Sequence, residues 1–343
     1  MLTRLLSLPA LVALSCAMLV ACADRGPALV EFTGATMGTR YSVKVVNALP
    51  ATQRDTLAAS IDETLERINA AMSTYDPDSE LSRFNASAST EWIDISGPTH
   101  EVLAEALRIS RLTRGAFDVT VGPAVNVWGF GPDMAPATLP DAAQIDAARR
   151  RIGFALLMLR DTPPALRKAR RDVYVDLSAI AKGYAVDRIA ALLDERGIDR
   201  YLVEIGGELR ARGASARDDT WRVAVERPLP TQRSVQRILP VLDTGMATSG
   251  NYRNFFERDG ERYSHTIDPR TARPVSHTLA SVTVLHPSAM TADALATAMS
   301  VLGTAEGLVL AERNRIAALF IDADGSKLTE TASSEFKQQV PST

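Results

Sequence analysis

The stretch from Asp176 to Asp187, read DLSAIAKGYAVD, combines an acid, a serine, a lysine and a glycine within one helical length. The alternating segment before it, 172–176, predicts a short strand. The residues after it have apolar side chains at helical spacing and end at Gly197. Free backbone N–H groups where a strand enters a helix can hold a phosphate. A simple N-cap with a solvent-exposed Lys182 explains the same window.

Two further windows carry groups suited to metal binding or proton transfer. Asp293 and Thr297 are four residues apart, so a predicted helix places both on one face. A carboxylate and a hydroxyl are hard oxygen ligands of the kind that Mg²⁺ uses beside phosphates. Asp293 also fits a role as the complement of a helix dipole. His265 is a candidate general base near neutral pH, oriented by Asp268, although a single histidine is often structural.

Four other windows place polar or aromatic groups at turns and helix ends. Met37 lies in a predicted turn at 36–39, and Tyr75 follows a predicted helix, where it can stack on a ligand or pack on the helix. The glycine-bounded segment 115–123 sets Asp118 between apolar neighbours. Residues 245–250 form a small-residue segment that we interpret as a loop able to face an anion.

The elements that position these windows follow from periodicity. A helix at 52–73 has one apolar stripe, and the second half of the chain is rich in alternating segments and turn signals. Expected strands are 39–46, 200–205, 208–212, 221–226, 237–243, 279–285 and 316–322, with a hairpin at 255–263 and further helices at 98–114, 141–152, 290–302 and 305–314. This mixture predicts an α+β fold with a mixed, largely antiparallel sheet and packed helices, in one catalytic unit from 35 to 331 followed by a polar tail at 332–343.

Composition limits the classes of function. The 343 residues are 46% hydrophobic and 23% charged, with a formal net charge of -3. This balance and the lack of a basic stripe with interleaved aromatics argue against nucleic-acid binding. The four histidines are scattered, without the spacing of zinc ligands.

The N-terminus has the pattern of an export signal. Arg4 precedes an apolar run, and Leu19-Val20-Ala21-Cys22 resembles a bacterial lipobox, which predicts a signal peptide at 1–22, lipidation of Cys22 and a tether at 23–34. An ordinary secretory signal or a short membrane anchor explains the same residues. Lipid would attach the protein to a membrane without a spanning helix, and we find no other run apolar enough to span one.

Taken in order, these windows resemble the ApbE family of flavin transferases. The resemblance runs from about residue 37 to residue 324. Its most specific pieces are Gly115-Ala-Phe-Asp118 with Val121-Gly-Pro123, the 176–187 block, Thr248-Ser-Gly250, Ser264-His265 with Asp268-Pro269, and Asp293 with Thr297.

The resemblance implies an enzyme that binds FAD with Mg²⁺ and transfers FMN to a threonine or serine hydroxyl of a partner protein, releasing AMP. It implies acceptors among subunits of membrane redox complexes, of the sodium-pumping NADH:quinone oxidoreductase or Rnf type. The residues implied to contact FAD are Met37, Tyr75, Ala116, Phe117, Asp118, Asp176, Lys182 and Ile267. Asp293, Thr297 and the carbonyl of Ala179 would bind Mg²⁺, whereas some members carry a further acid where this chain has Ala296.

In such a site His265 would remove the proton of the acceptor hydroxyl. The anchor and the acceptors together suggest the inner membrane, with the enzyme facing the periplasm. Two alternatives use the same residues: an FAD pyrophosphatase that releases FMN and AMP, and a flavin-binding assembly lipoprotein without catalytic activity.

Overall fold

A single eight-stranded sheet forms the centre of the molecule in the computed structural model, which describes residues 28–131, 138–229, 234–258 and 260–340. Every neighbouring pair in this sheet is antiparallel, which confirms the α+β expectation. In spatial order the strands are β1 (Leu29–Thr36), β2 (Thr39–Val46), β6 (Tyr201–Ile205), β7 (Glu208–Arg212), β10 (Thr244–Gly250), β15 (Leu279–His286), β16 (Ala317–Asp324) and β17 (Lys327–Ala332).

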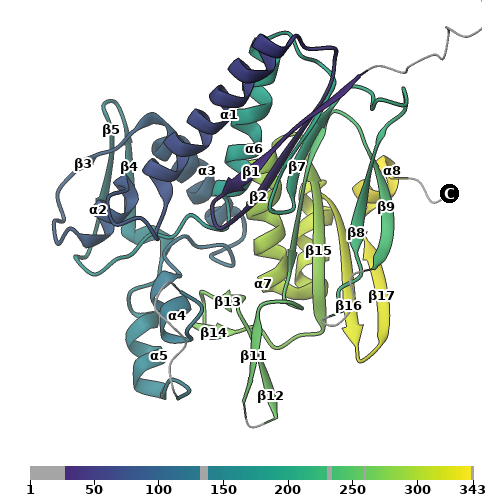
Figure 1. Ribbon diagram of the computed structural model, residues 1–343. Helices are drawn as coiled ribbons and strands as arrows, with labels where there is room; N and C mark the ends of the chain where they lie inside the picture. Colours follow the sequence, from purple (N-terminus) through teal and green to yellow (C-terminus); the bar gives the residue numbers. More distant parts are fainter. Residues whose placement is uncertain (1–27, 132–137, 230–233, 259, 341–343) are drawn as a thin grey trace, which may run out of the picture.

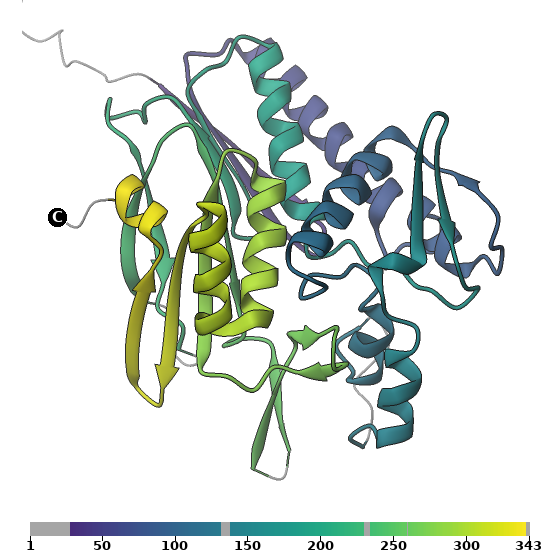
Figure 2. The same ribbon diagram turned by 180° about the vertical axis from the view of Figure 1, so that it is seen from behind.

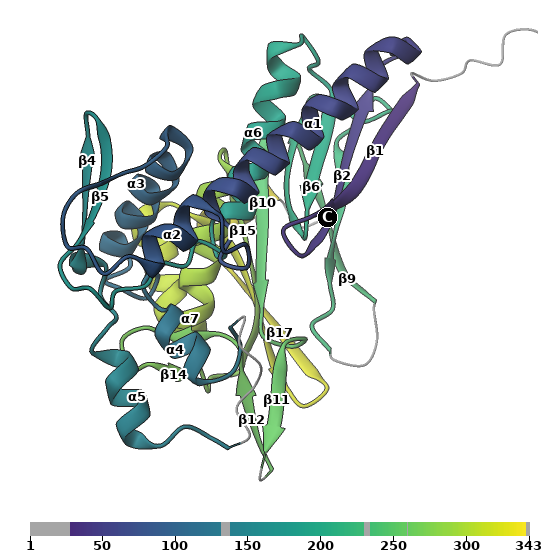
Figure 3. The same cartoon turned by 60° about the vertical axis from the view of Figure 1, so that its left-hand side comes forward.

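Three long helices cover one face of this sheet, as Figure 3 shows nearly edge-on: α1 (Ala51–Met72), α6 (Ala181–Glu195) and α7 (Ala289–Asn314). A fourth long helix, α3 (Gly97–Leu112), packs on α1 and α7 in the same helical layer. Their apolar stripes meet the inward side chains of the strands in the largest hydrophobic core, where Ile61, Ile189 and Val284 are fully buried. This burial fixes which helix faces remain available to form a site.

The opposite face of the sheet carries a smaller core. The ribbon of β8 (Trp221–Glu226) and β9 (Val235–Val241) packs there with α8 (Ser334–Gln339). Phe336 of α8 is fully buried, and the Ser333 hydroxyl accepts a hydrogen bond from its backbone N–H. The expectation of a polar tail from residue 332 is therefore wrong over α8, because two apolar positions, Phe336 and Val340, turn inward.

A third group of elements forms a satellite beside the helical layer, at the lower part of Figure 1. It contains α4 (Gly122–Val127), α5 (Ala142–Arg149), the hairpin of β11 (Phe255–Arg258) and β12 (Glu261–Ser264), and the short pair β13 (Ile267–Asp268) and β14 (Arg273–Pro274). Its apolar side chains form a separate cluster around Trp128. Trp128 Nε1 donates to the carbonyl of Ala272 at 2.8 Å, which ties α4 to the β13–β14 turn.

The remaining elements lie at the edge of the helical layer, visible from behind in Figure 2. A three-stranded sheet in the order β3 (Ile93–Asp94), β5 (Pro164–Lys168) and β4 (Leu157–Asp161) packs next to α2 (Glu80–Ala86) and the 3-10 turn Phe154–Leu156.

Three predicted segments differ from the structure. Residues 172–176 form no strand: Asn85 exchanges two hydrogen bonds of 2.8 Å with the backbone of Val175, and the N–H of Asp176 donates to the carbonyl of Val119. The segment 245–250 is not a loop but most of β10. The predicted tether overlaps β1, which begins at Leu29.

Helix α7 replaces two predicted helices and changes one expectation about membranes. Within the described residues it is the one helix long and apolar enough to cross a bilayer, so the expectation that no run after the N-terminal signal is this apolar is wrong. It packs against β10, β15 and α6 as a core helix of the fold. Gly303, with φ of +72°, is the break between the two predicted halves.

Candidate functional site

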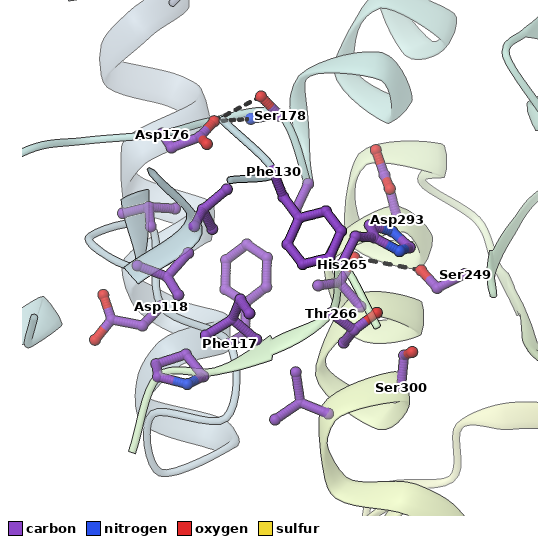
Figure 4. Close-up of a pocket in the computed structure, with 18 of the residues that line it drawn as sticks. Phe117, Asp118, Phe130, Asp176, Ser178, Ser249, His265, Thr266, Asp293 and Ser300 are labelled. Carbon is purple, nitrogen blue, oxygen red and sulfur yellow. Dashed lines mark hydrogen bonds between the residues drawn. The ribbon is translucent and has the colours of Figure 1, made fainter. Parts of the chain in front are cut away.

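A cavity of about 430 Å³ lies between the helical layer and the satellite. Figure 4 shows many of its side chains, which come from segments far apart in the sequence. Eleven of the predicted site residues line it: Tyr75, Ala116, Phe117, Asp118, Asp176, Ala179, Lys182, His265, Ile267, Asp293 and Thr297. Met37 is not among the lining residues; it lies partly buried against the main core in the β1–β2 turn. Cys22 lies outside the described residues.

Asp176 forms a local turn at the cavity edge. Its Oδ1 accepts hydrogen bonds from the backbone N–H and the hydroxyl of Ser178, at 2.9 and 2.6 Å. Ser178 does not cap the following helix, because α6 begins at Ala181 after Ile180, whose side chain makes no capping hydrogen bond. The acceptors at this helix start come from elsewhere: the N–H of Ala181 donates to the carbonyl of Leu177, and the N–H of Gly183 donates to Asp293.

Lys182 lies between two buried carboxylates. Its Nζ is 3.1 Å from Glu208 Oε2 and 3.9 Å from Asp293 Oδ2. Burial opposes charge on Lys182, but Asp293 and Glu208 outweigh it and raise the pKa of the ammonium. Burial raises the pKa of Glu208 to about 7 against the opposing effect of Lys182, and it raises the pKa of Asp293 as well. With both acids ionised, the cluster carries one excess negative charge, which favours a bound cation.

The junction of α6 and α7 fixes this cluster. The backbone N–H of Gly183 donates to Asp293 Oδ2 at 3.1 Å, and a Cβ at Gly183 would lie 2.3 Å from the carbonyl oxygen of Ala289. Asp187 accepts hydrogen bonds from the Ser288 hydroxyl and from the N–H groups of Ala289 and Met290. In the 176–187 block, Lys182 thus faces the cavity and Gly183 allows the two helices to approach closely. Asp187, the last acid of the block, caps α7.

The predicted metal ligands meet the chemistry of Mg²⁺. Asp293 is 3% exposed, and Thr297 shares a hydrogen bond of 3.3 Å with the hydroxyl of Ser249 on β10. Ala179 lines the same cavity, so carboxylate, hydroxyl and carbonyl oxygens are all available there. The described residues contain no cluster of three or more His, Cys, Asp or Glu side chains that could hold a metal. A hard ion here would therefore take other ligands from phosphate or water. Ala296 is fully buried in the main core, away from the cavity lining.

His265 is held as a base by the hairpin that precedes it. Its Nδ1 lies 2.9 Å from the carbonyl oxygen of Asn254, and its backbone N–H donates to the same oxygen. Because a carbonyl only accepts, Nδ1 carries the proton and Nε2 presents a lone pair. Burial lowers the pKa of His265 against the raising effect of this hydrogen bond, which favours the neutral ring. Asp268 does not orient the ring as expected, since its carboxylate binds Arg270 at 2.9 Å.

A stack of aromatic rings packs beside His265. Phe130 lies edge-on to the His265 ring, with centroids 6.3 Å apart, and stacks on Phe256 of β11 at 5.3 Å. Phe256 stacks on Tyr263 of β12 at 5.2 Å, and Tyr263 on Trp128 at 5.6 Å. The stack fixes the hairpin against the α4 side of the satellite, and the hairpin fixes His265.

Asp118 and Tyr75 have contrasting environments. Both oxygens of Asp118 accept hydrogen bonds from the protein, Oδ1 from Thr120 and Oδ2 from the N–H of Phe154 at 2.7 Å. Burial raises the pKa of Asp118 although these bonds oppose the change. The Asp118 carboxylate therefore shapes the loop that carries Phe117. Tyr75 is 71% exposed at the cavity, so its ring does not pack on the helix stripe.

Glu208 and Phe130 also line the cavity, and sequence reasoning missed both as site residues. The one sequence signal for Glu208 was an acid directly after the Gly206-Gly207 turn. The alternation of β7 predicts an inward side chain at this position. Phe130 stands in a short segment with no periodicity.

Comparisons with known proteins show the family of this chain. The model of the ApbE family matches residues 37–320. The chain is 46% identical to the FAD:protein FMN transferase of Vibrio cholerae over 95% of this chain and 97% of the relative, and 42% identical to that of Haemophilus influenzae over 96% of each. It is also similar to the solved flavin transferase ApbE from Vibrio cholerae, with a TM-score of 0.84 over 91% of this chain and 99% of that one. With most of its length matched by the family and its site residues gathered in one cavity, this chain belongs to the ApbE family.

Proposed function

We propose that this chain transfers the FMN half of FAD to a threonine or serine hydroxyl of an acceptor protein and releases AMP. The observation that carries the proposal is the shared cavity of Lys182, Asp293, Thr297 and His265, which brings cation-binding oxygens and a fixed base together. The names of the relatives supply the substrate, FAD, and the transferred group, FMN.

The reaction exchanges a phosphoanhydride bond for a phosphoester bond. The acceptor oxygen attacks the phosphorus on the FMN side, and the bond from that phosphorus to the bridging oxygen breaks. AMP leaves with the bridging oxygen, and the hydroxyl proton passes to His265 Nε2. The ammonium of Lys182 offers positive charge to the diphosphate.

The residues that would hold Mg²⁺ are Asp293, Thr297 and, through its carbonyl, Ala179. When bound, the ion supplies charge neutralisation at the diphosphate. The protein contributes the geometry: Gly183 N–H binds one oxygen of Asp293, and Ser249 engages the hydroxyl of Thr297.

The test is a transfer assay with purified protein, FAD, Mg²⁺ and a flavoprotein domain that carries a modifiable threonine. We expect fluorescent flavin that stays on the acceptor through a denaturing gel, with AMP released in equal amount. Equimolar free FMN and AMP with an unlabelled acceptor would instead indicate a hydrolase. FAD binding without any turnover would indicate a flavin-binding assembly protein.

We further propose that Cys22 carries lipid and that the enzyme faces the periplasm from the inner membrane, where it modifies subunits of NADH:quinone oxidoreductase or Rnf-type complexes. The lipobox at residues 19–22 supports the anchor. Metabolic labelling with a fatty acid should mark the parent protein and not Cys22→Ala, which should move from the membrane to the soluble periplasmic fraction. Equal labelling of both would contradict the anchor.

A further inference from the structure

The turn between β6 and β7, formed by Gly206, Gly207 and Glu208, runs along the side chain of Lys182. Gly206 has φ of +65°, and a Cβ there would lie 3.3 Å from Lys182 Cδ and 2.9 Å from Thr39 Cγ2. Glu204 accepts a hydrogen bond from the N–H of Gly207 at 2.8 Å, which fixes the turn. A side chain at 206 would therefore press on the lysine stem, and the turn leaves room for it.

The same turn ends in the carboxylate nearest to the ammonium. Glu208 is 4% exposed, and its Oε2 is 3.1 Å from Lys182 Nζ, against 3.9 Å for Asp293 Oδ2. Glu208 Oε2 is buried and has no hydrogen-bond partner in the part of the chain that the structure describes. The ion pair with Lys182 is the contact that accounts for this buried oxygen.

We propose that Glu208 is a positioning residue that holds the Lys182 ammonium away from Asp293 and so keeps the Asp293 carboxylate available to a metal ion. The inference rests on the proposed metal-assisted transfer. A buried ammonium pairs with the nearest carboxylate, since an unpaired charge is costly in a low-dielectric interior. Without Glu208, that carboxylate is Asp293, and the lysine would compete with the ion for it.

Net charge acts beside positioning, and the comparison of two backgrounds below separates the two effects. With both acids ionised, Glu208, Asp293 and Lys182 together carry one negative charge, which a cation can offset. With glutamine at 208, Lys182 and Asp293 neutralise each other, and little electrostatic attraction for a divalent ion remains.

The experiment measures Mn²⁺ binding to the full soluble chain by the electron paramagnetic resonance signal of the free ion, without FAD or acceptor. Glu208→Gln is compared with the parent, and the same change is made in a Lys182→Met background. We expect Glu208→Gln to weaken Mn²⁺ binding by about 10-fold or more, as changes beside metal ligands do. In the Lys182→Met background the loss should be several-fold smaller, because the competitor is absent. Glu195→Gln, an exposed charge loss on α6, is the matched control and should bind as the parent does.

Each other outcome overturns the inference. Equal losses in both backgrounds would make Glu208 a direct ligand or a simple source of charge, and an unchanged affinity would make it structural. If Asp293→Ala binds Mn²⁺ like the parent, the metal site of the proposed function is refuted, and the role of Glu208 falls with it. If Glu208→Gln does not fold, Glu208→Asp is measured in the same two backgrounds. This change keeps the charge and shortens the side chain.

Discussion

Gly183→Ala is the sharpest perturbation of the α6–α7 junction. The added Cβ would lie 2.3 Å from the Ala289 oxygen, 2.7 Å from its carbonyl carbon and 2.7 Å from Met290 Cα. All three are backbone atoms, so no side chain can turn aside, and the helices must separate. Overpacking of this kind costs about 3 kcal/mol at the upper end of its range. The charged hydrogen bond from Gly183 N–H to Asp293 is worth about 1.5 kcal/mol or more.

The combined loss of roughly 4–5 kcal/mol corresponds to a fall in Tm of about 7 °C, since the unfolding entropy is about 2.1 cal/mol/K per residue for a domain of about 300 residues. Calorimetry of the variant measures it, and transfer activity should fall as well, because Asp293 shifts relative to Lys182. Gly97→Ala is the control, since a Cβ there meets nothing within 4 Å. A Tm for Gly183→Ala equal to that of Gly97→Ala would refute the close-packing argument.

Further predictions concern the base, the stack, the cap and the ion. His265→Ala should lower kcat by about 10²–10⁴-fold while FAD affinity, followed by flavin fluorescence, stays near the parent value. Because burial lowers the pKa of His265 and the neutral ring is the base, the acid limb of the kcat profile should lie below pH 6.5; a limb above pH 7 would contradict this. Phe130→Ala should lower kcat while changing KM for FAD less, and Phe130→Tyr should recover kcat, as steady-state kinetics would show. Asp187→Ala should lower stability by about 1–2 kcal/mol in urea titrations, through the lost cap of α7. EDTA should abolish transfer and Mg²⁺ restore it; activity that persists in EDTA would rule out the metal role of Asp293.

Much of the architecture was predictable from the sequence, because the buried face of a helix or strand repeats apolar residues at the period of that element. The stripe of α1 and the alternation of β2, β6 and β8 are local patterns, and the observed elements match the predicted ranges closely. The ordered windows also predicted the family, which the comparisons confirm. Where pattern and structure disagree, the pattern was ambiguous. Residues 172–176 alternate because one side is buried, but Asn85 replaces a neighbouring strand.

The sequence alone determined most of the chemistry-bearing residues that surround the cavity, although not Glu208 or Phe130, since a motif of fixed types at fixed spacing is local information. Only the tertiary structure decided which of them act together. Lys182, Glu208 and Asp293 stand on α6, β7 and α7, and their ion pairs exist because Gly183 lets two helices touch and Gly206 lets a turn pass beside a lysine. Electrostatic coupling depends on distance through space and on burial, and neither quantity is written in the order of the residues.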